Sequence, residues 1–177
     1  MNIVGIICEY NPFHNGHIYH IKKCKELYPD SLVILAINGL FTERGLVSSL
    51  TKEDKTKLAL SYGVDLVIEL PVYYGTQSGD FFAYAALKLL NALGVNKLIF
   101  GSENTDLERL MTIAKKELNS DYILDNTSKD SYPKRLANSL GIEKVPPNDL
   151  LGISYIKNIK LVMYTILCQE WYQIIPS

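Results

Sequence analysis

Residues 3–20 read IVGIICEYNPFHNGHIYH, and this stretch decides the fold. It opens with an apolar run, Ile3 to Cys8, whose continuity is typical of a strand covered on both faces. A helical segment follows from His14 to Leu27, and Pro12 disfavours helix at the residue before it. A buried strand that leads directly into a helix is the first half of a parallel β-α-β unit.

The same order repeats along the chain. Apolar runs that predict strands lie at 32–37, 65–70 and 95–100, and segments that predict helices lie at 51–61, 78–93 and 106–118. This alternation predicts an α/β fold with an open, doubly wound parallel sheet. Right-handed crossovers bring the carboxyl ends of the strands, and any ligand, to one edge of the sheet.

After Leu118 the pattern is weaker. Residues 119–132 are polar and rich in turn formers, which predicts an exposed connection. A short helix is predicted at 133–140, where Gly141 ends it, and one more at 148–159.

Composition narrows the class of protein. The chain has 177 residues and a net charge of -1, which suits one domain and does not indicate a strongly basic nucleic-acid binder. Its three cysteines form no CxxC pair, which argues against a disulfide scaffold or a four-ligand zinc site and suits a reducing compartment. We expect a cytoplasmic protein with no membrane contact, because the N-terminus shows no export signal and the apolar end is interrupted by Gln169 and Glu170.

The junction between the first strand and its helix is the most informative place for chemistry. His14 and His17 are three residues apart, so they share a face of the first helical turn. Gly16 has no Cβ and leaves room for a flat or bulky group against that turn. A helix N-terminus with two imidazoles suits a phosphate whose negative charge grows during a reaction.

Two other interpretations of these histidines stay open. A helical histidine is more often structural or solvated, and His14 and His17 with His20 could instead bind a metal. No cysteine or carboxylate spacing completes a metal site, however, so we expect none. The position directly after the first strand favours a nucleotide.

The motifs resemble a known family. The H-x-G-H motif is the signature of the HIGH superfamily of nucleotidyltransferases, and the longer string GIICEYNPFHNGHIYHI at 5–21 is similar to the tRNA(Met) cytidine acetate ligase family. Four further strings agree: Glu43-Arg44-Gly45, GVDLVIELP at 63–71, FGSEN at 100–104 and PNDLLGISYIK at 147–157. The resemblance covers about residues 1–160 and implies the Rossmann-like fold of that superfamily.

The resemblance implies an ATP-dependent ligase. Such enzymes convert acetate and ATP, with Mg²⁺, to acetyl-adenylate and pyrophosphate, and pass the acetyl group to N4 of the wobble cytidine of elongator tRNA(Met). His14 and His17 would be catalytic, acting at the phosphates. The implied ATP site is formed by Ile7, Cys8, Glu9, Tyr10, Asn11, Pro12, Phe13, His14, Asn15, Gly16, His17, Ile18, Tyr19, His20, Gly101 and Asn148.

Weaker candidates lie nearby. Arg44 could clamp a carboxylate or phosphate, and a solvated loop charge is an equal alternative. Lys52, Lys55 and Lys57 could contact tRNA phosphates, although a solvated helix face is the favoured interpretation. Ser78 and Asp80 indicate a helix start.

The chain departs from the family near residue 160. The family's Tyr-Thr-x-x-Arg element is present as Tyr164-Thr165, but Cys168 stands at the arginine position. We therefore divide the chain into a nucleotidyltransferase-like domain, 1–160, and an apolar tail, 161–177. A frame slip, an early stop or a decayed copy would each produce this end. We expect the tail to pack on an outer helix or between two chains, and the protein to self-associate.

Three functions compete at this point. The first is the acetate–tRNA ligase, present as its N-terminal catalytic half. The second is a small-molecule adenylyltransferase that acts on pantetheine phosphate or nicotinate mononucleotide. The third is a nucleotide-binding remnant without catalysis, which the missing arginine favours.

Overall fold

The computed structural model describes residues 1–118, 129–162 and 172–176. Its parallel sheet has the order β3-β2-β1-β4-β5. The strands are β1 (Ile3–Cys8), β2 (Leu32–Asn38), β3 (Leu66–Leu70), β4 (Lys97–Ser102) and β5 (Tyr172–Pro176). The predicted doubly wound α/β fold is confirmed, and the first four strands lie within two residues of their predicted bounds at either end.

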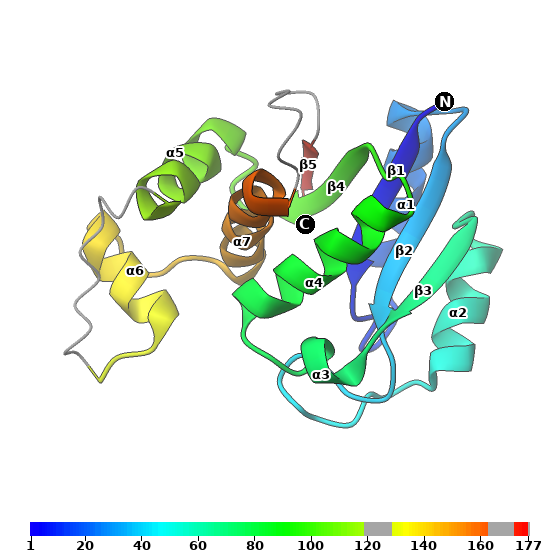
Figure 1. Ribbon diagram of the computed structural model, residues 1–177, viewed down its shortest axis with the longest axis horizontal. Coiled ribbons are helices and arrows are strands. Elements are labelled where there is room, and N and C mark those ends of the chain that lie inside the picture. The colour runs from blue at the N-terminus through cyan, green and yellow to red at the C-terminus, as the bar shows by residue number, and fades with distance from the viewer. Residues whose placement is uncertain (119–128, 163–171, 177) are drawn as a thin grey trace.

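Helices cover both faces of the sheet (Figure 1). They are α1 (Asn15–Leu27), α2 (Lys52–Ser61), α3 (Val72–Gly75), α4 (Gly79–Ala92), α5 (Leu107–Leu118), α6 (Tyr132–Leu140) and α7 (Pro147–Val162). Helices α1 and α2 pack on one face, whereas α4 and α7 pack on the other with α5 and α6 beyond them. The one-turn helix α3 follows Pro71 and was not predicted from the sequence.

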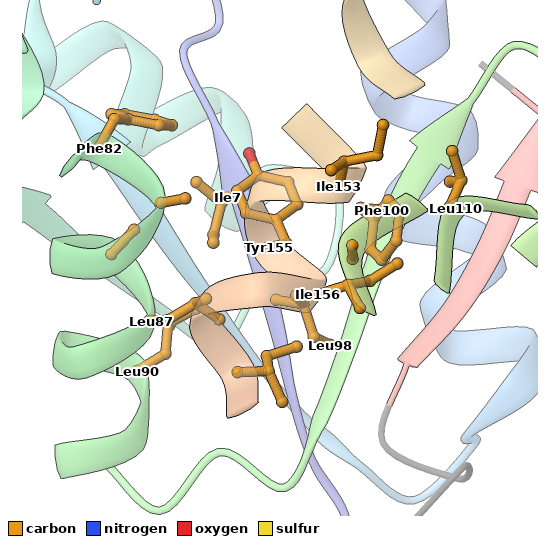
Figure 2. Packing of buried hydrophobic residues seen from close by; sticks show 14 of the residues in the cluster. Ile7, Phe82, Leu87, Leu90, Leu98, Phe100, Leu110, Ile153, Tyr155 and Ile156 are labelled. Atoms are coloured by element: carbon orange, nitrogen blue, oxygen red, sulfur yellow. The ribbon is translucent and has the colours of Figure 1, made fainter. Parts of the chain in front are cut away.

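Successive strand residues serve different cores, because side chains alternate across a strand. Val4 and Ile6 pack against α1, whereas Ile7 joins the core beneath α4 and α7. Figure 2 shows Ile7, Phe82 and Tyr155 converging there from β1, α4 and α7. Both sides of β1 are therefore buried, as its continuous apolar sequence predicted.

A polar cluster joins the helices of the second face. Asp80 accepts hydrogen bonds from Ser154 Oγ at 2.6 Å and from Lys157 Nζ at 3.0 Å. Lys157 also pairs with Glu117 at 2.6 Å, and the Tyr132 hydroxyl donates to the same carboxylate at 2.7 Å. The cluster connects α4, α5, α6 and α7. Ser78 is the residue before α4, so the predicted helix start is confirmed.

The interpretation of Lys55 as a solvated charge is wrong. Its side chain is fully buried, and Nζ donates to the carbonyl oxygens of Asn38 at 3.2 Å and Gly39 at 3.1 Å. Burial lowers the pKa of this amine. The lysine holds the end of β2 against α2, a contact that helical periodicity does not reveal.

The expectation that the apolar tail packs on an outer helix is wrong for residues 172–176. Residues 172–176 form β5, which pairs in parallel with β4 and buries Ile175. Leu161 and Val162 belong to α7, and 163–171 lie outside the described residues, as does most of the connection predicted at 119–132. Among the described helices, none is long and apolar enough to cross a membrane.

A substitution at Gly152 would test the packing of α7 on the sheet. A Cβ there would lie 2.6 Å from Phe100 Cε2, a ring atom that cannot move aside easily. We expect Gly152→Ala to lower the free energy of unfolding by about 1–3 kcal/mol, measured by urea denaturation. Gly79→Ala is the matched control, because its Cβ would have its nearest neighbour at 3.7 Å. Equal stability of the two variants would contradict the packing described.

Candidate functional site

A pocket of about 350 Å³ opens at the carboxyl ends of β1, β4 and β5. This is the edge of a doubly wound sheet at which ligands bind. Its walls are Ile7, Cys8, Glu9, Tyr10, Asn11, Pro12, His14, Gly16, His17, His20, Phe82, Phe100, Gly101, Asn148, Leu151, Tyr155, Ile175 and Pro176.

Two histidines form the start of α1 in this pocket. His14 is the N-cap residue, and its Nδ1 accepts the Gly16 N–H at 3.1 Å. In return, Nδ1 of His17 accepts the His14 N–H at 3.2 Å. The two rings stack with centroids 3.9 Å apart. This is a capping box in which imidazoles replace the usual serine and glutamate.

The capping box also fixes the protons of both rings. Because each Nδ1 accepts a backbone N–H, the proton of a neutral ring must lie on Nε2. Burial, with smaller contributions from His14 and His20, lowers the pKa of His17 from 6.5 to about 4. His17 is therefore neutral at pH 7 and offers Nε2–H to an incoming acceptor such as a phosphate oxygen.

Gly16 is required by the ring of His14. A Cβ at this position would lie 2.9 Å from His14 Cε1 and 3.0 Å from Nδ1. Any larger residue would push the imidazole out of the capping box. The spacing H-x-G-H is thus explained by the contact between the first histidine and the glycine.

His20 has a different role from the other two histidines. It is buried, its Nε2 lies 3.0 Å from the Ile99 carbonyl oxygen, and burial lowers its pKa to about 4. The neutral ring donates its proton to that carbonyl and ties α1 to β4. The interpretation of a helical histidine as a structural residue therefore applies to His20.

Aromatic side chains support the histidine pair from beneath. Tyr10 is buried, with a backbone φ of 51°, and its ring centroid lies 4.5 Å from that of His17. Phe13 stacks on His17 at 5.6 Å and on Tyr62 at 5.4 Å. The peptide bond between Asn11 and Pro12 is cis. These contacts restrict the orientation of the His17 ring.

Glu9 and Asn11 hold the loop at 39–50 beside the pocket. Glu9 Oε1 accepts hydrogen bonds from Asn38 Nδ2 at 2.8 Å and from the Glu43 N–H. Asn11 Oδ1 accepts the N–H of Ser49 at 2.7 Å and its hydroxyl at 2.8 Å. The loop is therefore attached at two points to the segment that precedes α1.

Two carboxylates join the end of β4 to the start of α7. Glu103 accepts the N–H groups of Asn148 at 3.2 Å and Asp149 at 3.1 Å, which caps the helix. Asp149 in turn accepts the Glu103 N–H at 3.1 Å, together with Ser102 Oγ and Asn104 Nδ2. This exchange brings Gly101 and Asn148 to one wall of the pocket.

Most of the residues predicted for the ATP site do line the pocket. The exceptions are Phe13, which supports His17 from the side, and three residues of α1: Asn15, Ile18 and Tyr19. Arg44 is exposed in the loop at 39–50 and does not line the pocket. The clamp role of Arg44 stays a prediction.

Several lining residues were missed from the sequence. Phe82, Phe100, Leu151 and Tyr155 lie in segments predicted only as helix or strand, and Ile175 and Pro176 lie in the predicted tail. Glu103 and Asp149 were missed as well, although each lies inside a motif quoted above. Each of the two motifs contains one of these acids. The hydrogen bonds between them, which join residues 46 positions apart, are visible only in the fold.

The electrostatics of the pocket are unusual for an anion site. Among the described residues that line it, none is lysine or arginine. Positive potential comes from the N-terminus of α1 and from imidazole N–H groups. Burial and the neighbouring Glu9 raise the pKa of the Cys8 thiol to about 12, which disfavours its thiolate form.

Comparison with known proteins assigns the chain to a family. The model of the HIGH nucleotidyl transferase family matches residues 1–170, and the chain belongs to that family. It is similar to a tRNA(Met) cytidine acetate ligase of Fusobacterium nucleatum, with 42% identity over 91% of this chain and 42% of that protein. A second ligase, from Mycoplasmopsis pulmonis, is 41% identical over 92% of this chain and 58% of its own length.

A solved structure agrees in fold. Thermotoga maritima TmcAL, crystallised with alpha-thio ATP, matches 99% of this chain and 47% of its own length, with a TM-score of 0.84 and 31% identity. The resemblance drawn from the motifs is thus confirmed. The chain spans about half the length of the relatives it matches.

The buried histidines predict a pH dependence of stability. The pKa values of His17 and His20 are about 4 in the folded chain, against 6.5 for an ordinary histidine, so the unfolded state binds more protons between these values. The free energy of unfolding should therefore be highest above pH 6.5 and fall as the pH drops toward 4. Nuclear magnetic resonance (NMR) titration of the ring protons and urea denaturation at several pH values would test this. Ordinary titration near 6.5 with flat stability would contradict it.

Proposed function

We propose that this chain binds ATP in the pocket beside His14 and His17 and activates acetate as acetyl-adenylate. The acetyl group is destined for N4 of the wobble cytidine of elongator tRNA(Met), and this chain corresponds to the nucleotide-binding half of the ligase. The similar ligases and the TmcAL crystallised with an ATP analogue support the proposal.

The observation that carries the proposal is the capping box. It makes both imidazoles donors through Nε2 at the N-terminus of a helix, without a buried positive charge. When an acetate oxygen attacks the α-phosphorus, negative charge grows on the phosphate oxygens and pyrophosphate leaves with the bonding electron pair. Preoriented N–H donors stabilise that charge, and no covalent nucleophile on the protein is needed.

Mg²⁺ enters this proposal together with ATP. Among the described residues, no group of three or more metal-ligating side chains comes together, and Glu9 is the one carboxylate in the pocket wall. That set fits an ion carried mainly by phosphate oxygens and water, with Glu9 as an oxygen ligand. The ion would neutralise phosphate charge when it is bound.

The non-catalytic remnant is the second candidate. It is favoured by the absence of lysine and arginine from the described pocket wall, since a triphosphate is commonly bound by such cations. No observation favours the small-molecule adenylyltransferase.

An exchange assay separates these functions. The chain is incubated with ATP, Mg²⁺ and labelled pyrophosphate, and the label is followed into ATP with acetate, pantetheine phosphate or nicotinate mononucleotide present. Exchange that depends on acetate supports the ligase, and exchange with another substrate supports the adenylyltransferase. ATP binding without exchange supports the remnant.

The catalytic role of His14 can be separated from its capping role. Asparagine is a favourable N-cap residue, so His14→Asn should retain the start of α1 but lose the Nε2 donor. We expect unchanged stability in thermal melts and a loss of about 10²–10³ in acetate-dependent exchange. His14→Ala is the matched control, which should lose both thermal stability and acetate-dependent exchange. Full exchange activity in His14→Asn would contradict the catalytic role of His14.

Self-association is a further proposal. In the described residues β5 is an edge strand, and the free N–H and C=O groups of such an edge can pair with another chain. Sedimentation at several protein concentrations tests it.

A further inference from the structure

The hydroxyl group of Tyr155 is a polar group that the fold itself does not use. The residue lies in α7 and is 4% exposed, so its ring belongs to the core. Among the described residues, none forms a hydrogen bond with this hydroxyl, and its oxygen is not one of the fully enclosed atoms that lack a partner. The oxygen is therefore accessible, and the space that it reaches is the pocket of about 350 Å³ that Tyr155 lines.

Packing holds the ring of Tyr155 in one orientation. Its centroid lies 5.6 Å from that of Phe100, with an angle of 66° between the two rings. Both rings are buried, and close packing of this kind restricts their rotation. Figure 2 shows the Tyr155 hydroxyl pointing away from Leu87 and Leu98, which lie on the other side of the ring. The hydroxyl thus has a fixed direction from which to contact a ligand.

Apolar side chains surround the space that this hydroxyl reaches. Ile7, Phe82 and Leu151 line the pocket from β1, α4 and α7. Ile7 is 7% exposed and Phe82 is 3% exposed, so neither can move aside without disturbing the core. Figure 2 shows Ile7 and Phe82 on the side of Tyr155 to which its hydroxyl points. Apolar walls with a single O–H donor suit a short aliphatic group that ends in an acceptor.

The hydroxyl is a proton donor across the neutral pH range. Burial raises its pKa, with smaller contributions from Cys8, Glu9 and Glu43, so it does not ionise there. Glu9 is the one carboxylate among the described residues of the pocket wall, and its Oε1 already accepts hydrogen bonds from Asn38 Nδ2 and the Glu43 N–H. These bonds offset its repulsion of an anion. A carboxylate oxygen is therefore a suitable acceptor for the Tyr155 hydroxyl.

We propose that Tyr155 binds the acid substrate, with its hydroxyl donating to one carboxylate oxygen and with Ile7, Phe82 and Leu151 around the methyl group. Tyr155 and His17 line one cavity, so the acid and the nucleotide meet there. The second carboxylate oxygen then forms a bond to the α-phosphorus as the bond from phosphorus to pyrophosphate breaks. This inference rests on the proposed function, which supplies the acid, and it names the residues that hold the acid and limit its length.

Saturation-transfer NMR on the intact chain tests the inference. Acetate and propionate are added separately, with Mg²⁺ and an ATP analogue that has a methylene group between the α- and β-phosphorus. Acetate should bind with a Kd of about 1 mM, because the described wall offers no cation. Propionate should bind at least about ten-fold more weakly, since its extra methylene group meets buried side chains. Binding of the ATP analogue is followed independently through the amide signals of residues 14–17.

Tyr155→Phe isolates the hydroxyl, because it removes one oxygen and keeps the ring. We expect acetate binding to weaken about ten-fold, with binding of the ATP analogue unchanged. Thermal stability should not fall, since the hydroxyl has no partner among the described residues. Leu151→Ala, which widens the pocket, should shift the preference from acetate toward propionate.

Tyr132→Phe is the matched control. The Tyr132 hydroxyl donates to Glu117 at 2.7 Å, and the residue does not line the pocket. Its removal should therefore lower the melting temperature and leave acetate binding unchanged. The two tyrosine variants thus separate a loss of stability from a loss of substrate binding.

Three results would overturn the inference even where the nucleotide binds as proposed. They are no acetate binding by the unaltered chain, equal acetate binding in Tyr155→Phe, and weaker nucleotide binding in Tyr155→Phe with acetate binding retained. The acetate-dependent exchange assay tests the proposed function separately. Acetate binding that depends on Tyr155, without any exchange, would refute the proposed function and leave this site as a carboxylate site. Exchange that Tyr155→Phe leaves unchanged would refute the inference alone.

Discussion

The reciprocal hydrogen bonds between His14 and His17 are the interaction on which the site depends. They satisfy two backbone N–H groups at the start of α1, and they leave each ring with Nε2 free for a ligand. One pair of side chains thus caps the helix and presents donors to the pocket. The close contact with Gly16 is part of the same arrangement, because a side chain there would displace the His14 ring.

Two networks of hydrogen bonds to carboxylates position the other walls of the pocket around the first turn of α1. Glu9 binds Asn38 and the Glu43 N–H, so the loop after β2 is attached to the end of β1. Glu103 and Asp149 bind across from β4 to α7. In both networks a carboxylate accepts backbone N–H groups that would otherwise be unpaired. Acids therefore help to hold the loops at the carboxyl edge of the sheet.

Much of the fold could be predicted from local pattern. Continuous apolar runs located β1 to β4, and helical periodicity with its stop signals located every helix of eight or more residues in the described chain. The short helix α3 was missed because four residues carry no periodicity, and β5 was missed because its partner β4 is distant in sequence. Lys55 was misjudged because its partners are the carbonyl oxygens at the end of β2.

The sequence by itself determined the strand-helix junction, its histidine pair and the edge of the sheet where the candidate pocket lies. These features are local, since a capping turn and the direction of a parallel strand follow from neighbouring residues. Only the tertiary structure decided which acids meet, and that the buried His20 bonds to the Ile99 carbonyl of β4. The physical reason is that hydrogen-bond partners and burial depend on chain segments that are distant in sequence.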